Sequence, residues 1–105
     1  MPTYCRVRIS ATSEIEANTI SRTLVTKKLV AGTIIYSGNS HYWWKGEIVE
    51  KIYWNIGAFS LLEKKDEIID EVRKLHSDVC PVIAFNTIDG NVDFLEWIDD
   101  SVEKY

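Results

Sequence analysis

The sequence predicts an α+β protein in which two helices pack on one face of a four-stranded antiparallel sheet and a further helix closes the chain. Two observations carry this prediction. Apolar residues recur in the order strand, helix, strand, strand, helix, strand, helix, which is the ferredoxin-like, split βαβ arrangement. Residues 32–59 also read as one extended β-hairpin with its tip at Lys45-Gly46. With 105 residues and no linker, we expect a single domain over residues 1–105.

The first strand and the first helix follow from local patterns. Residues 4–10 alternate between apolar and polar side chains, which is typical of a half-buried strand. Ser13 and Glu16 have the spacing of a capping box, in which a hydroxyl and a carboxylate satisfy free N–H groups at a helix start. We expect this helix to run to about Leu29. Its buried stripe is expected to be Ala17, Ile20, Leu24 and Leu29.

The hairpin is long for a domain of this size. Each arm holds roughly a dozen residues, or about 40 Å of strand at about 3.3 Å per residue. A domain of this length is only about 34 Å across, and a two-stranded ribbon in water is marginally stable. We therefore expect a second copy of the chain to cover the hairpin. Within its first arm, Ser37-Gly38-Asn39 is expected to form a bulge or bend.

The second half of the chain predicts two helices around a strand. Residues 63–76 are amphipathic, and Pro81 prevents that helix from continuing into the next segment. Residues 82–88 are nearly all apolar and predict the fourth strand, which we expect to pair antiparallel with the first. Residues 92–103 predict the closing helix.

Composition excludes several classes of partner. A net charge of −4 argues against nucleic acid, because phosphate binding needs a basic surface. No segment has the roughly 20 consecutive apolar residues of a membrane span, and the N-terminus lacks a signal-peptide core, so we expect a cytoplasmic protein. Cys5 and Cys80 are expected to be buried thiols at opposite ends of the sheet, without a disulfide between them.

Three segments resemble one known family. Residues 40–46, SHYWWKG, resemble the S-x-Y-x-W-x-G signature of the CutA or divalent-cation-tolerance proteins. Residues 22–31 are similar to the family's first-helix stretch, and residues 90–98, GNVDFLEWI, to its G-N-x-x-Y-L-x-W-I close. The resemblance implies a PII-like fold, a tight homotrimer joined through the long hairpins, and a non-enzymatic role in divalent cation binding, nominally of copper.

The chain departs from the family pattern at polar positions. Gly32 stands where the family usually has a cysteine, and Phe59-Ser60 where it has a Lys-Thr pair. Residues 76–82 keep the histidine and second proline of the family's H-P-Y-x-x-P-E segment but lack its tyrosine and glutamate. Two alternatives follow. One is a PII-like sensor that binds a nucleotide or small metabolite between subunits, and the other is a structural trimeric module whose site has decayed.

Three residues are candidate metal ligands. His76 and Cys80 are four residues apart, and an imidazole with a thiolate suits copper or zinc. His41, beside the hairpin tip, is expected to join them across a subunit boundary. The alternative is structural: His76 caps the second helix, Cys80 packs, and His41 is simply exposed.

The hairpin aromatics are candidates for an interface or a ligand cleft. The set comprises Tyr42, Trp43, Trp44, Tyr53 and Trp54, aromatic side chains of the kind that anchor interfaces. Alternation sends Trp43 and Trp44 to opposite faces. Glu50 is the one carboxylate on an apolar strand face, where burial would raise its pKa. A charged partner such as Lys51 or Arg8 is the simpler expectation for it. The chain has no recognisable catalytic set of Ser, His and Asp or of Cys and His, and no Gly-rich phosphate loop, so we expect no catalysis.

Overall fold

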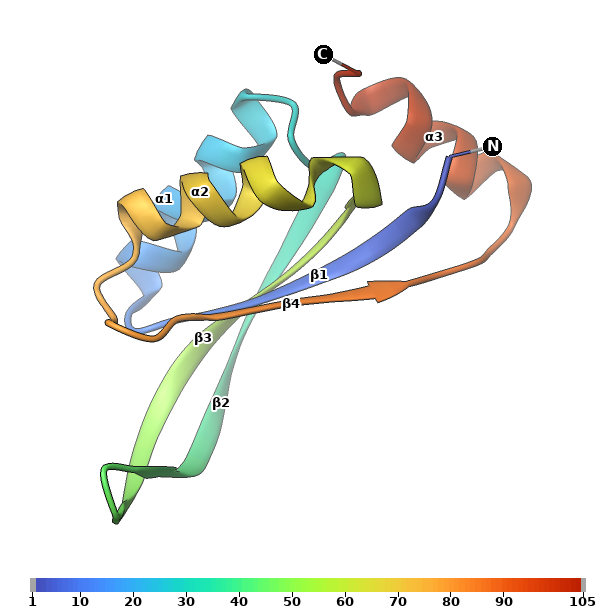
Figure 1. Ribbon diagram of the computed structural model, residues 1–105. Helices are drawn as coiled ribbons and strands as arrows, with labels where there is room; N and C mark the ends of the chain where they lie inside the picture. Colours follow the sequence, from blue (N-terminus) through green and yellow to red (C-terminus); the bar gives the residue numbers. More distant parts are fainter. Residues whose placement is uncertain (1, 105) are drawn as a thin grey trace.

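The computed structural model describes residues 2–104 and contains eight elements. In chain order these are β1 (Tyr4–Ala11), α1 (Glu14–Thr26), β2 (Gly32–Trp44), β3 (Glu47–Leu61), a short 3₁₀ turn (Leu62–Lys64), α2 (Lys65–Leu75), β4 (Val82–Thr87) and α3 (Val92–Ser101). The strands form one antiparallel sheet in the order β2-β3-β1-β4. This is the predicted α+β, split βαβ topology, with α1 and α2 together on one face of the sheet (Figure 1).

The end of α1 differs from the prediction. The helix stops at Thr26 instead of Leu29, because Lys28 adopts a left-handed conformation with φ of 57°. The Leu29 amide donates to the Leu24 carbonyl and the Lys28 amide to the Val25 carbonyl, the two bonds of a Schellman motif. Glycine usually occupies the left-handed position, so a lysine there gave no recognisable stop signal. The four predicted buried positions of this segment are nevertheless buried.

The hairpin of β2 and β3 extends well beyond the helices (Figure 1), and the molecule measures 44 × 24 × 21 Å. Lys45 and Gly46 both have positive φ, at 50° and 81°, as a two-residue type I′ turn requires. The predicted bulge at Ser37-Gly38-Asn39 is wrong. Gly38 pairs with Tyr53 in an unbroken register that runs from one end of the hairpin to the other. The glycine is accommodated within the ladder, so no residue is extruded.

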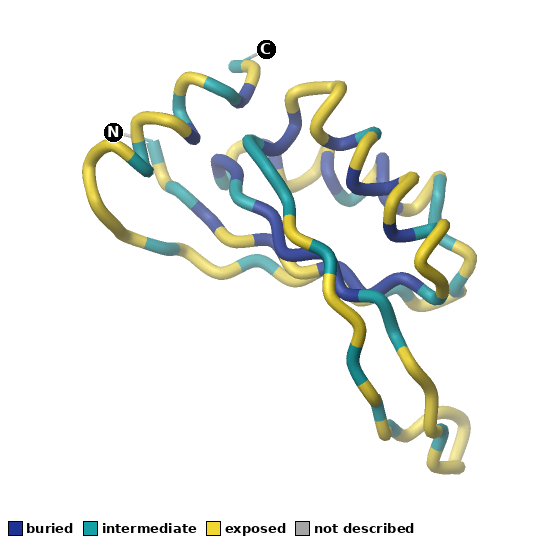
Figure 2. The backbone as a smooth tube through the Cα atoms, turned by 180° about the vertical axis from the view of Figure 1, so that it is seen from behind, coloured by how far each residue is buried: buried dark blue, intermediate teal, exposed yellow. Residues whose placement is uncertain are grey.

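The main core lies between the sheet and the first two helices (Figure 2). Residues of β1 at odd positions, and Trp54, Ile56 and Ala58 at even positions of β3, pack on the side of α1 and α2, as the alternation predicted. The fully buried members include Val7, Ile9, Ile56 and Ala58 from the sheet and Ile20, Leu24, Ile68 and Val72 from the helices. Trp54 packs against this cluster from β3.

Helix α3 covers the opposite face of the sheet, but only at one end. Phe59 of β3 meets Phe94 edge-on with ring centroids 5.1 Å apart, and Leu61 is buried with Ile98. The rest of that face is uncovered in the single chain, where Ile34 and Tyr36 are exposed. None of the helices within residues 2–104 is long and apolar enough to span a membrane.

The two cysteines lie at opposite ends of the sheet, as predicted, but only one is buried. Cys5 is in the core, where burial raises the pKa of its thiol to about 11. Cys80 is exposed, in the loop between α2 and β4. That prediction failed for Cys80 because the loop runs along the rim of the sheet instead of beneath a helix.

Candidate functional site

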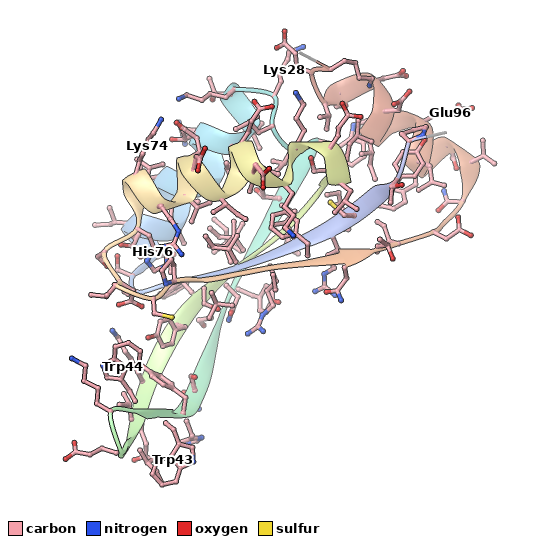
Figure 3. All side chains as sticks on the ribbon, in the orientation of Figure 1. Lys28, Trp43, Trp44, Lys74, His76 and Glu96 are labelled. Atoms are coloured by element: carbon pink, nitrogen blue, oxygen red, sulfur yellow. The ribbon has the colours of Figure 1, made fainter. Side chains whose placement is uncertain are left out.

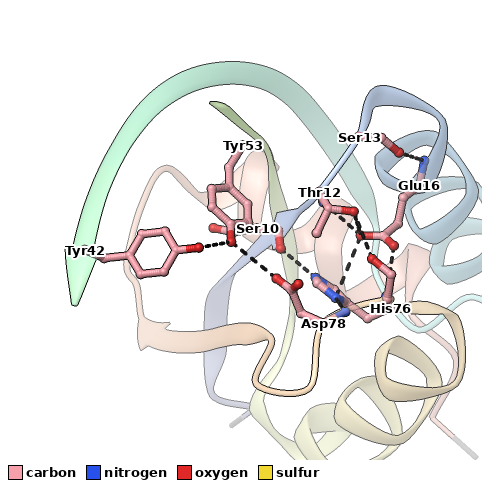
Figure 4. Close-up of polar contacts among 9 residues, drawn as sticks. Ser10, Thr12, Ser13, Glu16, Tyr42, Tyr53, His76 and Asp78 are labelled. Carbon is pink, nitrogen blue, oxygen red and sulfur yellow. Dashed lines mark hydrogen bonds and ion pairs between the residues drawn. The ribbon is translucent and has the colours of Figure 1, made fainter. Parts of the chain in front are cut away.

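A chain of hydrogen bonds joins the hairpin to the loop that follows α2 (Figure 4). The Tyr42 and Tyr53 hydroxyls lie 2.8 Å apart, and the Tyr53 hydroxyl donates to Oδ2 of Asp78 at 3.4 Å. Burial, the bond to Tyr42 and the charge of Asp78 raise the pKa of the Tyr53 phenol. Tyr53 is therefore protonated and donates its one hydroxyl hydrogen to Asp78. The Tyr42 hydroxyl must then donate to the Tyr53 oxygen. The geometry fixes the polarity of this chain.

His76 connects the same loop to β1 through its side chain. Its side chain is fully buried, its Nε2 lies 2.6 Å from the carbonyl oxygen of Ser10, and its Nδ1 accepts from the Asp78 amide at 3.0 Å. A carbonyl can only accept, so Nε2 carries the proton and the ring is the neutral Nε2–H tautomer. Both ring nitrogens are thus engaged in binding the protein's own backbone. This resembles the predicted structural role, although His76 bonds β1 and the loop in addition to ending α2.

Glu16 binds the other side of the loop. Its carboxylate accepts from the Thr12 amide and the Ser77 amide, each at 2.9 Å, and lies 3.8 Å from Nδ1 of His76. Partial burial opposes ionisation, but the hydrogen bonds from Thr12 and Ser77 outweigh it and lower the pKa of Glu16. Because the Ser13 hydroxyl also accepts from the Glu16 amide, the predicted helix start at Ser13 is confirmed. The Glu16 side chain reaches one residue further back than a capping box requires, to Thr12.

A groove of about 430 Å³ lies where the hairpin leaves the sheet. Its floor is Arg8, Ser10 and Asn55, and its walls come from the hairpin on one side and from the α2–β4 loop and the start of β4 on the other. A larger hollow of about 600 Å³ runs along α1, but one helix supplies its whole lining. We therefore take the groove, where four strands and a loop converge, as the candidate site.

The three predicted metal ligands lie in different surroundings. His41 on β2 faces Glu50 on β3, with Nε2 and Oε1 3.2 Å apart and both side chains exposed. Cys80 is exposed at the groove, and His76 is enclosed by its backbone bonds. Within residues 2–104, no three His, Cys, Asp or Glu side chains gather closely enough to hold a metal ion. One copy therefore does not bring the three residues together.

The predicted aromatic residues occupy three different environments. Trp43 and Trp44 project to different sides of the hairpin tip, as alternation predicted (Figure 3). Trp43, which is 71% exposed, and Trp44 both contribute to the groove lining, and the Lys45 ammonium lies 5.8 Å from the Trp44 ring centre. Trp54 packs on the core, and Glu50 remains exposed beside His41 instead of buried.

Tyr53, one of the predicted hairpin aromatics, lines the groove, but the sequence pattern did not indicate the roles of Arg8, Asn55 or Asp78 there. Arg8 was predicted to be a polar position of an alternating strand and a candidate partner of Glu50, but Glu50 pairs with His41 instead. Asn55 is 7% exposed and pairs with Ser10 across β1 and β3, which requires the strand register to recognise. Buried side-chain amides are almost always hydrogen-bonded. An asparagine within the apolar third strand was therefore the signal for a polar partner on a neighbouring strand, which the register identifies as Ser10.

Comparison with known proteins gives a consistent family. The model of the family described as CutA1 divalent ion tolerance protein matches residues 5–101. The divalent-cation tolerance protein CutA of Archaeoglobus fulgidus is 37% identical over 98 residues, covering 92% of this chain and 96% of that protein. The protein of the same name from Thermotoga maritima is 34% identical over 91 residues, covering 86% of this chain and 90% of that protein.

Solved structures agree with the fold. The periplasmic divalent cation tolerance protein CutA of Archaeoglobus fulgidus superimposes with a TM-score of 0.92 at 36% identity, over 95% of this chain and 99% of that one. The divalent cation tolerance protein of Thermus thermophilus has a TM-score of 0.92 at 28% identity over the same shares. The CutA1 structure from Oryza sativa has a TM-score of 0.94 at 20% identity, covering 99% of this chain and 97% of that one, which supports the fold alone.

Proposed function

The chain belongs to the CutA1 divalent ion tolerance family, and we propose that it acts without catalysis, as a homotrimer that binds a divalent cation, with copper the first candidate. The observation that carries the assembly is the projecting hairpin. Its face beyond the helices presents Trp43, Ile48 and Ile52, which are 71%, 62% and 55% exposed. Several large exposed apolar side chains on one face of a hairpin are typical of an interaction site. The number three rests on the family resemblance.

The same hairpin supports the cation proposal. His41 and Glu50 form an exposed cross-strand pair of a nitrogen and an oxygen donor. Asp78 and Cys80 line a second hollow of about 210 Å³ beside Tyr42 and Tyr53. Imidazole, thiolate and carboxylate are ligands of copper and zinc. Each pair, His41 with Glu50 and Asp78 with Cys80, supplies too few ligands for a closed metal site. We propose that copies assembled through their hairpins bring ligand pairs from different subunits together.

His76 differs from His41 and Cys80 as a metal ligand because both of its ring nitrogens are already hydrogen-bonded. To bind a metal, it would have to release the Asp78 amide from Nδ1 or the Ser10 carbonyl from Nε2. Leaving either buried backbone group unpaired costs about 1–3 kcal/mol. We therefore expect His41 and Cys80 to dominate cation affinity. The cytoplasmic location stays a prediction from the sequence.

Two measurements test the proposal. Native mass spectrometry at micromolar concentration is expected to show a trimer, and a compact monomer would contradict the assembly. Calorimetric titration with Zn²⁺ and Cu²⁺ is expected to show saturable binding that weakens in both His41→Gln and Cys80→Ser. His76→Gln serves as the comparison variant, with little effect on affinity expected. If both variants bind the cation with the same affinity as the wild type, His41 and Cys80 are not ligands.

A further inference from the structure

The groove at the hairpin base has the chemistry of a small-molecule site, apart from the cation proposal. Its volume of about 430 Å³ falls in the usual range for ligand pockets, about 300–1,000 Å³. Tyr42, Trp44 and Val82 supply apolar surface in its lining, while Arg8 and Asp78 supply one charge of each sign. Such a combination of ring surface and a few placed polar groups is typical of pockets that orient an organic ligand.

The floor of the groove is held by buried polar groups. Ser10 and Asn55 are only 6% and 7% exposed, and they face each other across β1 and β3. The Ser10 hydroxyl donates to Oδ1 of Asn55 at 3.0 Å, and an Arg8 Nη2–H donates to the same oxygen at 3.4 Å. The Asn55 amide nitrogen has one long bond, at 3.5 Å, to the Tyr36 carbonyl. The second N–H of that amide has no acceptor among residues 2–104.

The Arg8 side chain is exposed on the sheet. Its neighbours across the two adjacent strands are Gly57 and Ala84, the smallest residues, so no side chain directly beside it covers the guanidinium. Among residues 2–104, no carboxylate forms an ion pair with Arg8. Its one hydrogen bond leaves most of five N–H donors unused, and those donors match a carboxylate in bidentate geometry.

We propose that this groove binds a small organic carboxylate with an aromatic body, its carboxylate on Arg8 and its ring against the tyrosine and tryptophan wall. The single cation favours a monoanion. Asp78 lines the same groove and opposes a second negative charge, which disfavours a phosphate dianion. A ligand that also carries an ammonium group gains Asp78 as a partner, so aromatic amino acids belong to the same class.

The test uses four matched probes on the protein in its native assembly. Phenylacetate carries the ring and the carboxylate, 2-phenylethanol the ring alone, phenyl phosphate the ring and a dianion, and phenylalanine a zwitterion. Binding is measured by saturation-transfer NMR and by shifts of the Trp44 indole N–H. Phenylacetate or phenylalanine is expected to bind more tightly than the alcohol and the phosphate.

Arg8→Gln is expected to weaken phenylacetate binding by roughly tenfold or more, the scale of losing one charge-assisted pair. Arg6→Gln is the matched control, since Arg6 is exposed on the same sheet face and does not line the groove. If phenylalanine binds more tightly than phenylacetate and Asp78→Asn removes the difference, the zwitterion is the preferred form.

Three results would overturn the inference. The first is equal phenylacetate binding by the Arg8 and Arg6 variants, and the second is tighter binding of phenyl phosphate than of phenylacetate. The third is no response to any of the four probes, which would show that a second copy fills the groove. Unchanged cation binding in Arg8→Gln separates this inference from the cation proposal.

Discussion

The Nε2–H of His76 donates to the carbonyl oxygen of Ser10 at 2.6 Å, which connects the end of α2 to the end of β1 next to the groove. The same ring accepts the Asp78 amide, so one buried side chain positions both the groove floor and the residue that receives the Tyr53 hydroxyl. The position of the α2–β4 loop therefore depends on hydrogen bonds between the His76 ring and the backbone. These bonds require the neutral imidazole.

Replacing His76 by alanine is expected to destabilise the fold. The change leaves the Ser10 carbonyl and the Asp78 amide unpaired and removes a buried ring, with a cost of about 2–4 kcal/mol. Urea unfolding measures the change in the free energy of unfolding. His41→Ala, at an exposed histidine, is the control and is expected to stay within about 0.5 kcal/mol of wild type. Equal stability of the two variants would show that the His76 bonds contribute nothing.

Glu16 is expected to make stability depend on acid pH. Its pKa is lower in the folded protein than in the unfolded chain, so its contribution is complete above the unfolded value of about 4.3. That contribution is lost as pH falls through the folded pKa. Glu16→Gln is therefore expected to lower the free energy of unfolding at pH 7 and to flatten its decline on acidification.

Glu14→Gln is the matched control for Glu16, because Glu14 is an exposed carboxylate in the same first turn of α1. Chemical unfolding at several values between about pH 2 and pH 7 measures both variants against wild type. A decline in the Glu16 variant as steep as that of wild type would assign the acid sensitivity to other groups.

Gly32 is expected to tolerate no side chain without movement of α3. A Cβ at this position would lie 2.8 Å from Cη2 and 3.3 Å from Cζ2 of Trp97. Gly32→Ala is expected to lower the free energy of unfolding by about 1–3 kcal/mol, the usual cost of overpacking. Gly38→Ala is the comparison, since its new Cβ would meet only the Asn55 amide at 3.6 Å. If Gly38→Ala proves the more damaging, the Trp97 contact is not the limiting one.

The exposed face of the hairpin is expected to contribute to self-association. Trp43→Ser should raise the dissociation constant of the oligomer, because Trp is an anchor residue at interfaces. Sedimentation equilibrium measures this constant. Ile15→Ser serves as control, since Ile15 is 81% exposed on α1, away from the hairpin. An oligomer that weakens equally in both variants, or in neither, would place the interface elsewhere.

Much of the fold could be predicted because local patterns repeat along each element. Alternation in β1 and the helical periodicity of α1 and α2 identified which faces are buried, and Ser13 identified where α1 begins. The end of α1 could not be predicted, because Lys28 accepts a left-handed conformation that glycine usually signals. Gly38 misled the strand prediction, since a glycine within a regular ladder has the same sequence signature as one at a bulge.

The candidate site was less predictable than the fold. The hairpin aromatics were identified from the sequence, and the structure places Tyr42 and Trp44 in the groove wall. Arg8 and Asn55 were not identified, because their importance depends on small cross-strand neighbours and on pairing with Ser10, and both follow from register. Cys80 was expected to be buried, but the path of an irregular loop has no periodicity to indicate exposure.

The sequence by itself determined the element order, the α+β class and a hairpin longer than one copy can cover, because these depend on periodicity and chain length. Only the tertiary structure decided that His76 is bonded to the backbone through both ring nitrogens, that His41 pairs with Glu50, and that Arg8 lies exposed in the floor of a groove. These are contacts between residues far apart in the chain. They depend on strand register and loop path, which neighbouring residues do not encode.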